Sequence, residues 1–193
     1  MTEQNSDHSF PLSDVVAKRW SPRAYSSTHV LSAKDLGPCF EAARWSPSSG
    51  NSQPWSFVVG FRGDELFSAM VASMAEGNAI WAAHASAVVA NITMTHSAEG
   101  KALSHAVYDL GQAVSHFSIQ ATAEDLLVHQ MGGFNSPELG ETLGLADNFT
   151  VVTLMTVGVL GDIADLSEKL QDRERAPRVR KPLSEIVIHG ASY

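Results

Sequence analysis

Two short segments of the sequence carry side chains suited to binding a polar ligand. Residues 18–23 read KRWSPR, which puts two guanidinium groups and a hydroxyl within five residues. Residues 45–55 read WSPSSGNSQPW, a polar loop at the entrance to an apolar segment of strand length. Arginine presents forked donors that match the oxygens of a phosphate. The two segments together favour a ligand with an anionic tail and a planar body with polar edges.

The basic residues of the chain lie near its two ends. The protein has 13 Lys and Arg against 21 Asp and Glu, a formal net charge of -8. No Lys or Arg occurs from Ala102 to Glu168, whereas nine acids do. Such an acidic body repels nucleic acid and anionic membranes, so neither is expected as a partner. The two basic clusters are expected to meet around a small anion if the fold joins the ends of the chain; the alternative is a solvated basic face with a polar tail.

Several other kinds of chemistry find no support in the sequence. None of the eight histidines forms an HExxH or HxH pattern, so no metal site is expected. No GxSxG, GxGxxG or Walker A motif occurs. Cys39 is the single cysteine, which excludes an internal disulfide, and its place on an apolar helix face favours an inert buried thiol.

Length and composition indicate one globular domain, residues 1–193. Of the residues, 44% are hydrophobic and 18% charged, and no run of about 20 apolar residues occurs, so a membrane span is not expected. The first ten residues, MTEQNSDHSF, have neither the basic nor the apolar region of a secretory signal. We therefore expect a cytoplasmic protein.

The segments that must position these residues alternate between helix and strand. Ser32 and Asp35 predict the start of a helix that ends before Pro47, and Val107, Leu110, Val114, Phe117 and Ala121 define one face of a long helix. Gly111 interrupts that helix, which suggests that something packs closely there. Residues 64–74 predict another helix, and residues 55–61, 85–94 and 151–160 predict strands. This order indicates a sheet sandwiched between helices.

At the same positions the sequence resembles the nitroreductase family of flavin enzymes. Arg19, Ser21 and Arg23 match its Arg-x-Ser-x-Arg stretch, and residues 47–55 match its Pro-Ser-Ser-x-Asn-x-Gln-Pro-Trp motif. A Gly-rich turn (MGGF, residues 131–134) and a basic pair before proline (RVRKP, residues 178–182) follow in the family's order. The resemblance extends from about Leu12 to Ile188.

The resemblance implies an α+β fold with a central mixed sheet flanked by helices, in an intertwined homodimer that holds FMN at the subunit interface. The arginines and Ser21 would bind the phosphate and ribityl chain, the polar loop would line the ribityl chain and the ring edge, and the two glycines would lie close to flavin N5. The implied cofactor-binding residues are Arg19, Trp20, Ser21, Arg23, Ser49, Asn51, Gln53, Gly132, Gly133, Arg178 and Arg180.

The implied activity is an NAD(P)H-dependent flavin oxidoreductase. NADH or NADPH would reduce FMN, which would pass electrons to a small electron-poor acceptor such as a nitroaromatic or quinone. Two departures limit the comparison: Gly132 stands where better-known members have an acid, and residues 77–84 lack the lysine that those members place at the flavin pyrimidine edge. No catalytic residue is assigned. The alternatives are an enzyme of the same fold that acts on flavin or on a dedicated metabolic substrate, and a non-catalytic FMN-binding protein.

Overall fold

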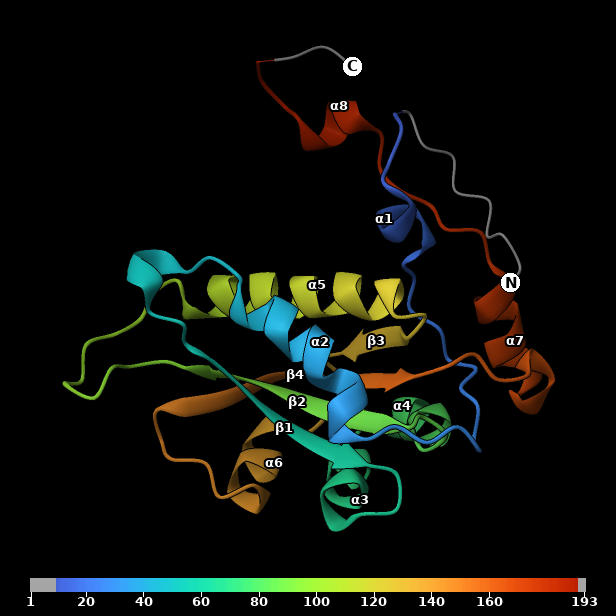
Figure 1. The fold of residues 1–193 in the computed structure, drawn as a ribbon, viewed down its shortest axis with the longest axis horizontal. Helices are drawn as coiled ribbons and strands as arrows, with labels where there is room; N and C mark the ends of the chain where they lie inside the picture. Colours follow the sequence, from blue (N-terminus) through green and yellow to red (C-terminus); the bar gives the residue numbers. More distant parts are fainter. Residues whose placement is uncertain (1–9, 191–193) are drawn as a thin grey trace.

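The computed structural model describes residues 10–190, in which helices cover both faces of one sheet (Figure 1). The prediction of a cytoplasmic location used residues 1–10, and the first nine of these lie outside the described range. Within the described range, no helix is long and apolar enough to cross a membrane. The elements are α1 (Asp14–Lys18), α2 (Ala33–Arg44), the 3-10 turn η1 (Ser49–Asn51), β1 (Trp55–Phe61), α3 (Glu65–Ala72), α4 (Glu76–Ala82), β2 (Ala87–Met94), α5 (Ala106–Ala123), β3 (Leu127–Met131), α6 (Ser136–Thr142), β4 (Phe149–Gly158), the 3-10 turn η2 (Ile163–Asp165), α7 (Glu168–Arg175) and α8 (Leu183–Ile186).

The sheet has four strands in the order β1-β2-β4-β3, and every neighbouring pair is antiparallel. The expectation of a mixed sheet was therefore wrong. The crossover through α5 gives β2 and β3 the same direction, as in a βαβ unit. However, β4 lies between them and runs opposite to both, so no two parallel strands are neighbours.

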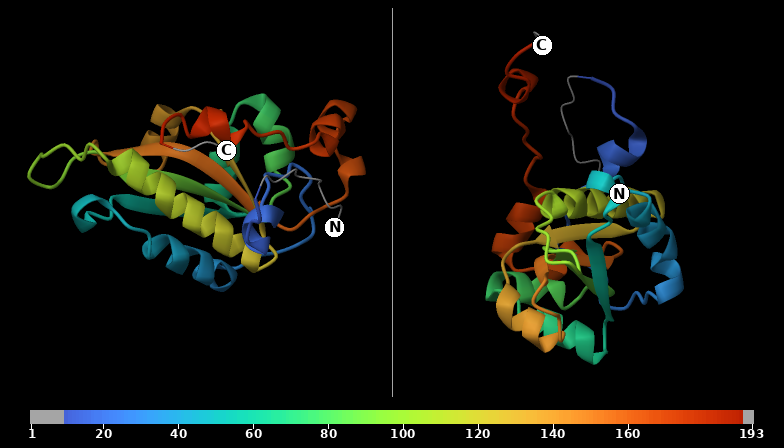
Figure 2. Two further views of the ribbon diagram at one scale, coloured as in Figure 1. Left: turned by 90° about the horizontal axis from the view of Figure 1, so that it is seen from above. Right: turned by 90° about the vertical axis from the view of Figure 1, so that its left-hand side faces the viewer.

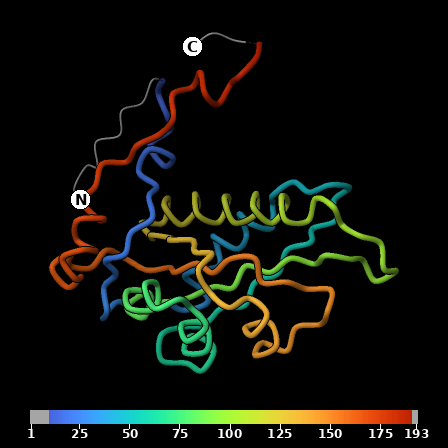
Figure 3. Tube along the Cα trace, turned by 180° about the vertical axis from the view of Figure 1, so that it is seen from behind, coloured from blue at the N-terminus to red at the C-terminus, as the bar shows by residue number. Residues whose placement is uncertain are grey.

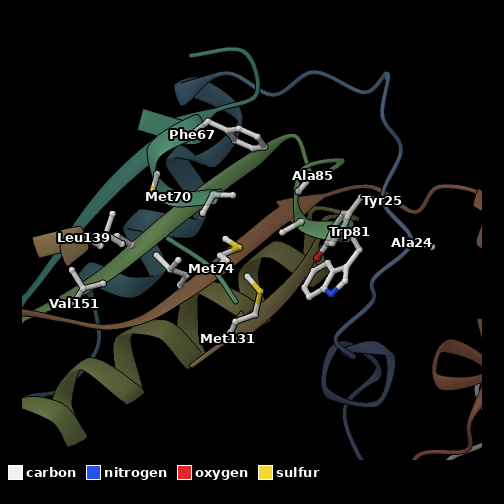
Figure 4. Packing of buried hydrophobic residues seen from close by; sticks show 14 of the residues in the cluster. Ala24, Tyr25, Phe67, Met70, Met74, Trp81, Ala85, Met131, Leu139 and Val151 are labelled. Atoms are coloured by element: carbon white, nitrogen blue, oxygen red, sulfur yellow. The ribbon is translucent and has the colours of Figure 1, made fainter. Parts of the chain in front are cut away.

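The two faces of the sheet bury separate apolar clusters, because successive side chains of a strand point to opposite faces. Ala87 and Val89 of β2 pack with α2 and α5, while Val88, Ala90 and Ile92 pack on the other side with residues of α3, α4 and α6. Figure 4 shows the second cluster, where Trp81 and Tyr25 pack at one end. The strand β2 is thus buried on both faces and is the centre of the fold.

The expected strands 55–61, 85–94 and 151–160 are confirmed as β1, β2 and β4, and the expected helices as α2, α3 and α5. Asp35 closes a capping box with Ser32 at the start of α2, and these hydrogen bonds lower the pKa of Asp35. The expected core face of α5 is wrong at Val107, which is 57% exposed. The strand β3 was not expected, because LVHQM is short and half polar.

The two ends of the described chain leave the body side by side. The N-terminal segment with α1 and the C-terminal segment with α8 extend together beyond the α5 layer (Figures 2 and 3). The C-terminal segment exposes Val179, Ile186 and Ile188 there. The fold thus joins the two basic ends of the sequence, as the charge distribution suggested.

Candidate functional site

The two basic clusters of the sequence meet in one cavity of about 190 Å³. This arginine cavity lies between the N-terminal segment on one side and the end of α7 with the stretch that follows it on the other. Its lining consists of Arg19, Trp20, Ser21, Arg23, Arg173, Glu174, Ala176, Arg178 and Arg180. Six of the eleven cofactor-binding residues expected from the sequence are therefore brought together. Lys181 does not line the cavity and pairs instead with Glu185 at 3.8 Å.

Arg178 holds the N-terminal segment in place across 161 positions of sequence. One of its terminal nitrogens donates to the Arg19 carbonyl at 2.5 Å, and the other donates to the Ala17 carbonyl at 2.8 Å. The Nε atom of Arg178 is buried and has no acceptor among the described residues. Arg178 therefore combines a structural role with an unused donor at the cavity.

Glu174 fixes the other end of the same segment. Its carboxylate is buried and accepts the backbone N–H of Arg23 at 2.9 and 3.1 Å and that of Ala24 at 3.2 Å. The Arg23 guanidinium lies 3.8 Å away. At Gly161, a Cβ would clash with the Tyr25 carbonyl oxygen, so only glycine permits the hydrogen bond from Gly161 N–H to the Ala24 carbonyl that continues this anchorage.

His129 on β3 links the segment to the sheet. Its Nδ1 lies 2.8 Å from the Pro22 carbonyl, which can only accept, so Nδ1 carries the proton. The imidazole packs on Trp81 of α4, with ring centroids 4.5 Å apart. Burial is the main reason that the pKa of His129 falls to about 4, and the Arg23 charge lowers it further. The imidazole is therefore neutral near neutral pH.

The arginine cavity is short of negative charge. Burial lowers the pKa of Arg19, and the charges of Arg178 and Arg180 lower it further. Within residues 10–190, none of these three arginines lies within 4.0 Å of a carboxylate oxygen. Guanidinium groups that repel one another are stabilised by a bound anion, and phosphate matches their forked donors. The donor set and the unused Nε of Arg178 thus fit a phosphate group.

The polar loop of residues 48–53 lies elsewhere. Its η1 turn precedes β1, and Ser49 N–H donates to Asp109 in the first turn of α5 at 3.1 Å. The α1 segment lies near the opposite end of α5 (Figures 1 and 2). A helix of 18 residues spans about 27 Å. Ser49, Asn51 and Gln53 therefore do not join the arginine cavity within one chain.

The two expected glycines lie at the end of β3. Gly133 accepts hydrogen bonds through its carbonyl from Ala75 N–H at 2.9 Å and from the Asn78 side chain at 3.2 Å. A Cβ at Gly133 would come within 2.9 Å of that Asn78 amide. Gly132 is three residues beyond His129, about 10 Å along an extended chain. The turn thus follows the same edge strand as His129, which contacts the segment that lines the arginine cavity.

Sequence reasoning missed several polar residues around these regions. Arg173 and Glu174 line the arginine cavity, although neither was among the residues expected at the site. Asp109 is 2% exposed and is the one charged residue among the buried residues of α5, a signal that could have drawn attention to it. Among residues 10–190, no three metal-ligating side chains lie close enough together to hold a metal ion.

Comparison with known proteins adds independent information. A profile of the Nitroreductase family matches residues 16–90. The "Putative NADH dehydrogenase/NAD(P)H nitroreductase" of Archaeoglobus fulgidus is 30% identical over 179 residues, which cover 86% of this chain and 95% of that protein. An uncharacterised 15.4 kDa protein of Mycolicibacterium smegmatis is 28% identical over 142 residues, which cover 69% of this chain and 95% of that protein.

A solved structure agrees over the full length. The crystal structure of an oxidoreductase containing FMN superimposes with a TM-score of 0.92 at 31% identity, covering 99% of this chain and 98% of that one. A similarity of this extent includes the sheet, both helical layers and the segments that form the arginine cavity. With the profile match and the relative from Archaeoglobus fulgidus, it establishes that the chain belongs to the nitroreductase family.

Proposed function

We propose that the protein is an FMN-dependent oxidoreductase that takes electrons from NADH or NADPH and passes them to a small electron-poor acceptor, such as a nitroaromatic or a quinone. The arginine cavity carries this proposal, because it combines a deficit of negative charge with donors that suit a phosphate. The named activities of the relatives support the choice of electron donor and acceptor. Bound FMN would supply the hydride-accepting and hydride-donating ring.

The residues of the chain would bind and orient the cofactor. Arg19, Arg23 and Arg180 would hold the phosphate, and Ser21 would donate a hydroxyl hydrogen bond beside them. Arg178 would keep the N-terminal segment closed over the phosphate through the Ala17 and Arg19 carbonyls. The small residues after β3 would let a ring approach the backbone, and neutral His129 would add no charge near it.

We further propose a homodimer in which each FMN lies between two chains. The segment after α1 that lines the arginine cavity and the 48–53 loop lie at opposite ends of α5, so one chain cannot present both to one cofactor. Val107 and Tyr108 of α5 are 57% and 69% exposed, and nothing in the described chain lies within 4 Å of a Cβ at Gly111. A second copy packed on this face would cover these residues and explain the helical glycine. The projecting C-terminal segment would pack on the same partner.

The first test is a fluorescence titration of the purified protein with FMN. Arg180→Glu puts an acid in the cavity at an exposed position, and we expect it to weaken FMN binding at least about a hundredfold, since an attractive charge becomes repulsive. Arg23→Glu should act in the same direction but would also repel nearby Glu174. Arg175→Glu makes the same charge change on α7 outside the cavity and is the control. Wild-type protein that binds no FMN would refute the proposal.

The second test asks whether the site is shared between chains. Arg180→Glu should abolish phosphate binding in the arginine cavity of its own chain. Asn51→Gly should remove the amide side chain from the 48–53 loop without backbone strain, because glycine adopts the φ of 55° found there. Co-expression with two tags yields mixed dimers of the two variants. A shared site predicts one restored FMN site in each mixed dimer. Mixed dimers as defective as their parents would show that each site belongs to one chain.

The third test concerns turnover. FMN-loaded protein is mixed anaerobically with NADH or NADPH, and flavin absorbance is followed before and after adding nitroaromatics and quinones. Bleaching by the nicotinamide and recovery with the acceptor would support the proposed reaction. Bound FMN that neither nicotinamide reduces would instead indicate a flavin-binding protein without this activity, and release of altered flavin would indicate that flavin is the substrate.

A further inference from the structure

We infer that Asp109 is a positioning residue for the flavin site and that it acts through the backbone N–H of Ser49. The inference rests on the proposed FMN-binding function, because the 48–53 loop is the part of the site that Asp109 contacts. Asp109 itself would touch neither cofactor nor substrate. Its role would be to hold Asn51 and Gln53 in the conformation in which their amides face the ligand.

At one position, Gln53, the loop has a conformation that its sequence does not favour. Gly50, Asn51 and Gln53 have φ angles of 58°, 55° and 45°, in the left-handed region. Glycine adopts this region freely and asparagine tolerates it, but a residue such as glutamine pays about 1–2 kcal/mol. Such a conformation persists only where the surroundings hold it. The loop therefore needs anchors outside itself.

The hydrogen bonds inside the loop do not supply those anchors. Asn51 N–H donates to the Ser48 carbonyl at 3.0 Å, Gln53 N–H donates to Ser48 Oγ at 3.0 Å, and the Gln53 side chain donates to the Asn51 carbonyl at 3.3 Å. These bonds close the turn but leave it free to move as a unit. The Ser49 N–H to Asp109 bond, at 3.1 Å, ties the turn itself to the helix below.

The neighbouring anchors lie outside the left-handed stretch. Ser46 Oγ lies 2.6 Å from His116 Nδ1 on α5, before the turn, and the Pro54 carbonyl accepts from Met94 N–H at 2.8 Å, after it. Asp109 and His116 are seven residues apart on α5, so they lie two turns apart on a similar face. Of these three anchors within the described chain, the Asp109 contact is the one that meets the loop at its turn.

The burial of Asp109 is consistent with a dedicated role. A carboxylate with 2% exposure is costly unless its charge is stabilised. Its place in the first turn of α5 supplies the positive end of the helix dipole, and Ser49 supplies a donor. A hydrogen bond to a charged acceptor is stronger than one between neutral groups. The buried charge thus strengthens the single bond that fixes the turn.

The test removes the donor and the acceptor of the Ser49–Asp109 hydrogen bond in separate variants. Ser49 begins the η1 turn, and Ser48 before it has φ -147° and ψ 155°, so the preceding backbone admits proline at position 49, whose ring carbon would stand where the N–H now points at the Asp109 carboxylate and would displace it. Ser49→Pro deletes the N–H, whereas Ser49→Ala keeps the N–H and deletes only the side chain. Asp109→Ala removes the acceptor, and Asp109→Asn retains an acceptor oxygen of the same shape. Each variant is compared in FMN affinity, in hydrogen exchange of the residue 51–53 amides, and in urea denaturation.

We expect Ser49→Pro and Asp109→Ala to weaken FMN binding about tenfold to a hundredfold and to speed exchange of the loop amides, while exchange in β2 stays slow. Ser49→Ala keeps the N–H and should leave exchange of the loop amides as in wild type, and Asp109→Asn, which keeps an acceptor oxygen but loses the charge, should lie between wild type and Asp109→Ala. Equal behaviour of Ser49→Pro and Ser49→Ala would overturn the inference. Faster loop exchange with unchanged FMN affinity would also overturn it while leaving the proposed function intact. Wild-type protein that binds no FMN would instead refute the proposed function.

Discussion

Truncation of Glu174 tests how the N-terminal segment is attached to the rest of the fold. The carboxylate accepts the backbone N–H groups of Arg23 and Ala24, and Glu174→Ala leaves both without an acceptor. Ala24 is 2% exposed, so water cannot replace the lost bond, and Arg23 N–H is partly buried. Each unsatisfied donor costs about 1–3 kcal/mol. The Arg23 guanidinium adds little, because its side chain is 25% exposed and lies 3.8 Å away.

These contributions sum to about 3 kcal/mol, near the lower end of the range for breaking a buried charged pair. The unfolded fraction would therefore rise by roughly a hundredfold. Urea denaturation of the cofactor-free protein measures the change, and Glu174→Gln, which keeps one acceptor oxygen, should recover part of it. Asp172→Ala, an exposed acid on the same helix, should change stability by less than about 0.5 kcal/mol.

The assay has a clear negative result. A loss in Glu174→Ala no larger than that in Asp172→Ala would refute the reasoning, because the two buried donors would then have found other acceptors. A loss of the expected size with normal FMN affinity would show that Glu174 stabilises the fold without shaping the arginine cavity.

Two further predictions follow from buried titratable groups. The pKa of His129, about 4, lies below its ordinary value of about 6.5, so between these values the unfolded chain binds a proton that the native chain does not. The free energy of unfolding should therefore fall by about 2 kcal/mol on going from about pH 7.5 to about pH 5, as measured by urea denaturation. This loss should be absent in His129→Gln. Parallel pH profiles of stability for the wild type and the variant would contradict the prediction. Burial also raises the pKa of Cys39 to about 11. A thiol reagent at about pH 8 should therefore label the protein when it is unfolded in urea but not when it is folded. Rapid labelling of the folded protein would count against a buried thiol.

Much of the architecture could be predicted from local pattern. Alternating or continuous apolar runs identified β1, β2 and β4, and the spacing of Leu110, Val114 and Phe117 identified α5. These signals are local, because side-chain direction repeats every two residues in a strand and every 3.6 in a helix. The strand β3 carried no such signal, and the exposure of Val107 depends on which segments pack against α5, which the spacing of apolar residues does not show.

The sequence by itself determined the family, the two basic clusters and most of the element order, because motifs and periodicity are properties of neighbouring residues. The tertiary structure decided the rest. Only packing could place β4 between β2 and β3, bring Glu174 onto the backbone of Arg23 across 151 positions, and set Asp109 against Ser49. The same packing put the arginine cavity and the 48–53 loop at opposite ends of α5. Residues that the sequence assigned to one ligand are thus divided between two ends of a rigid helix, and this division is the physical reason that we propose a site shared by two chains.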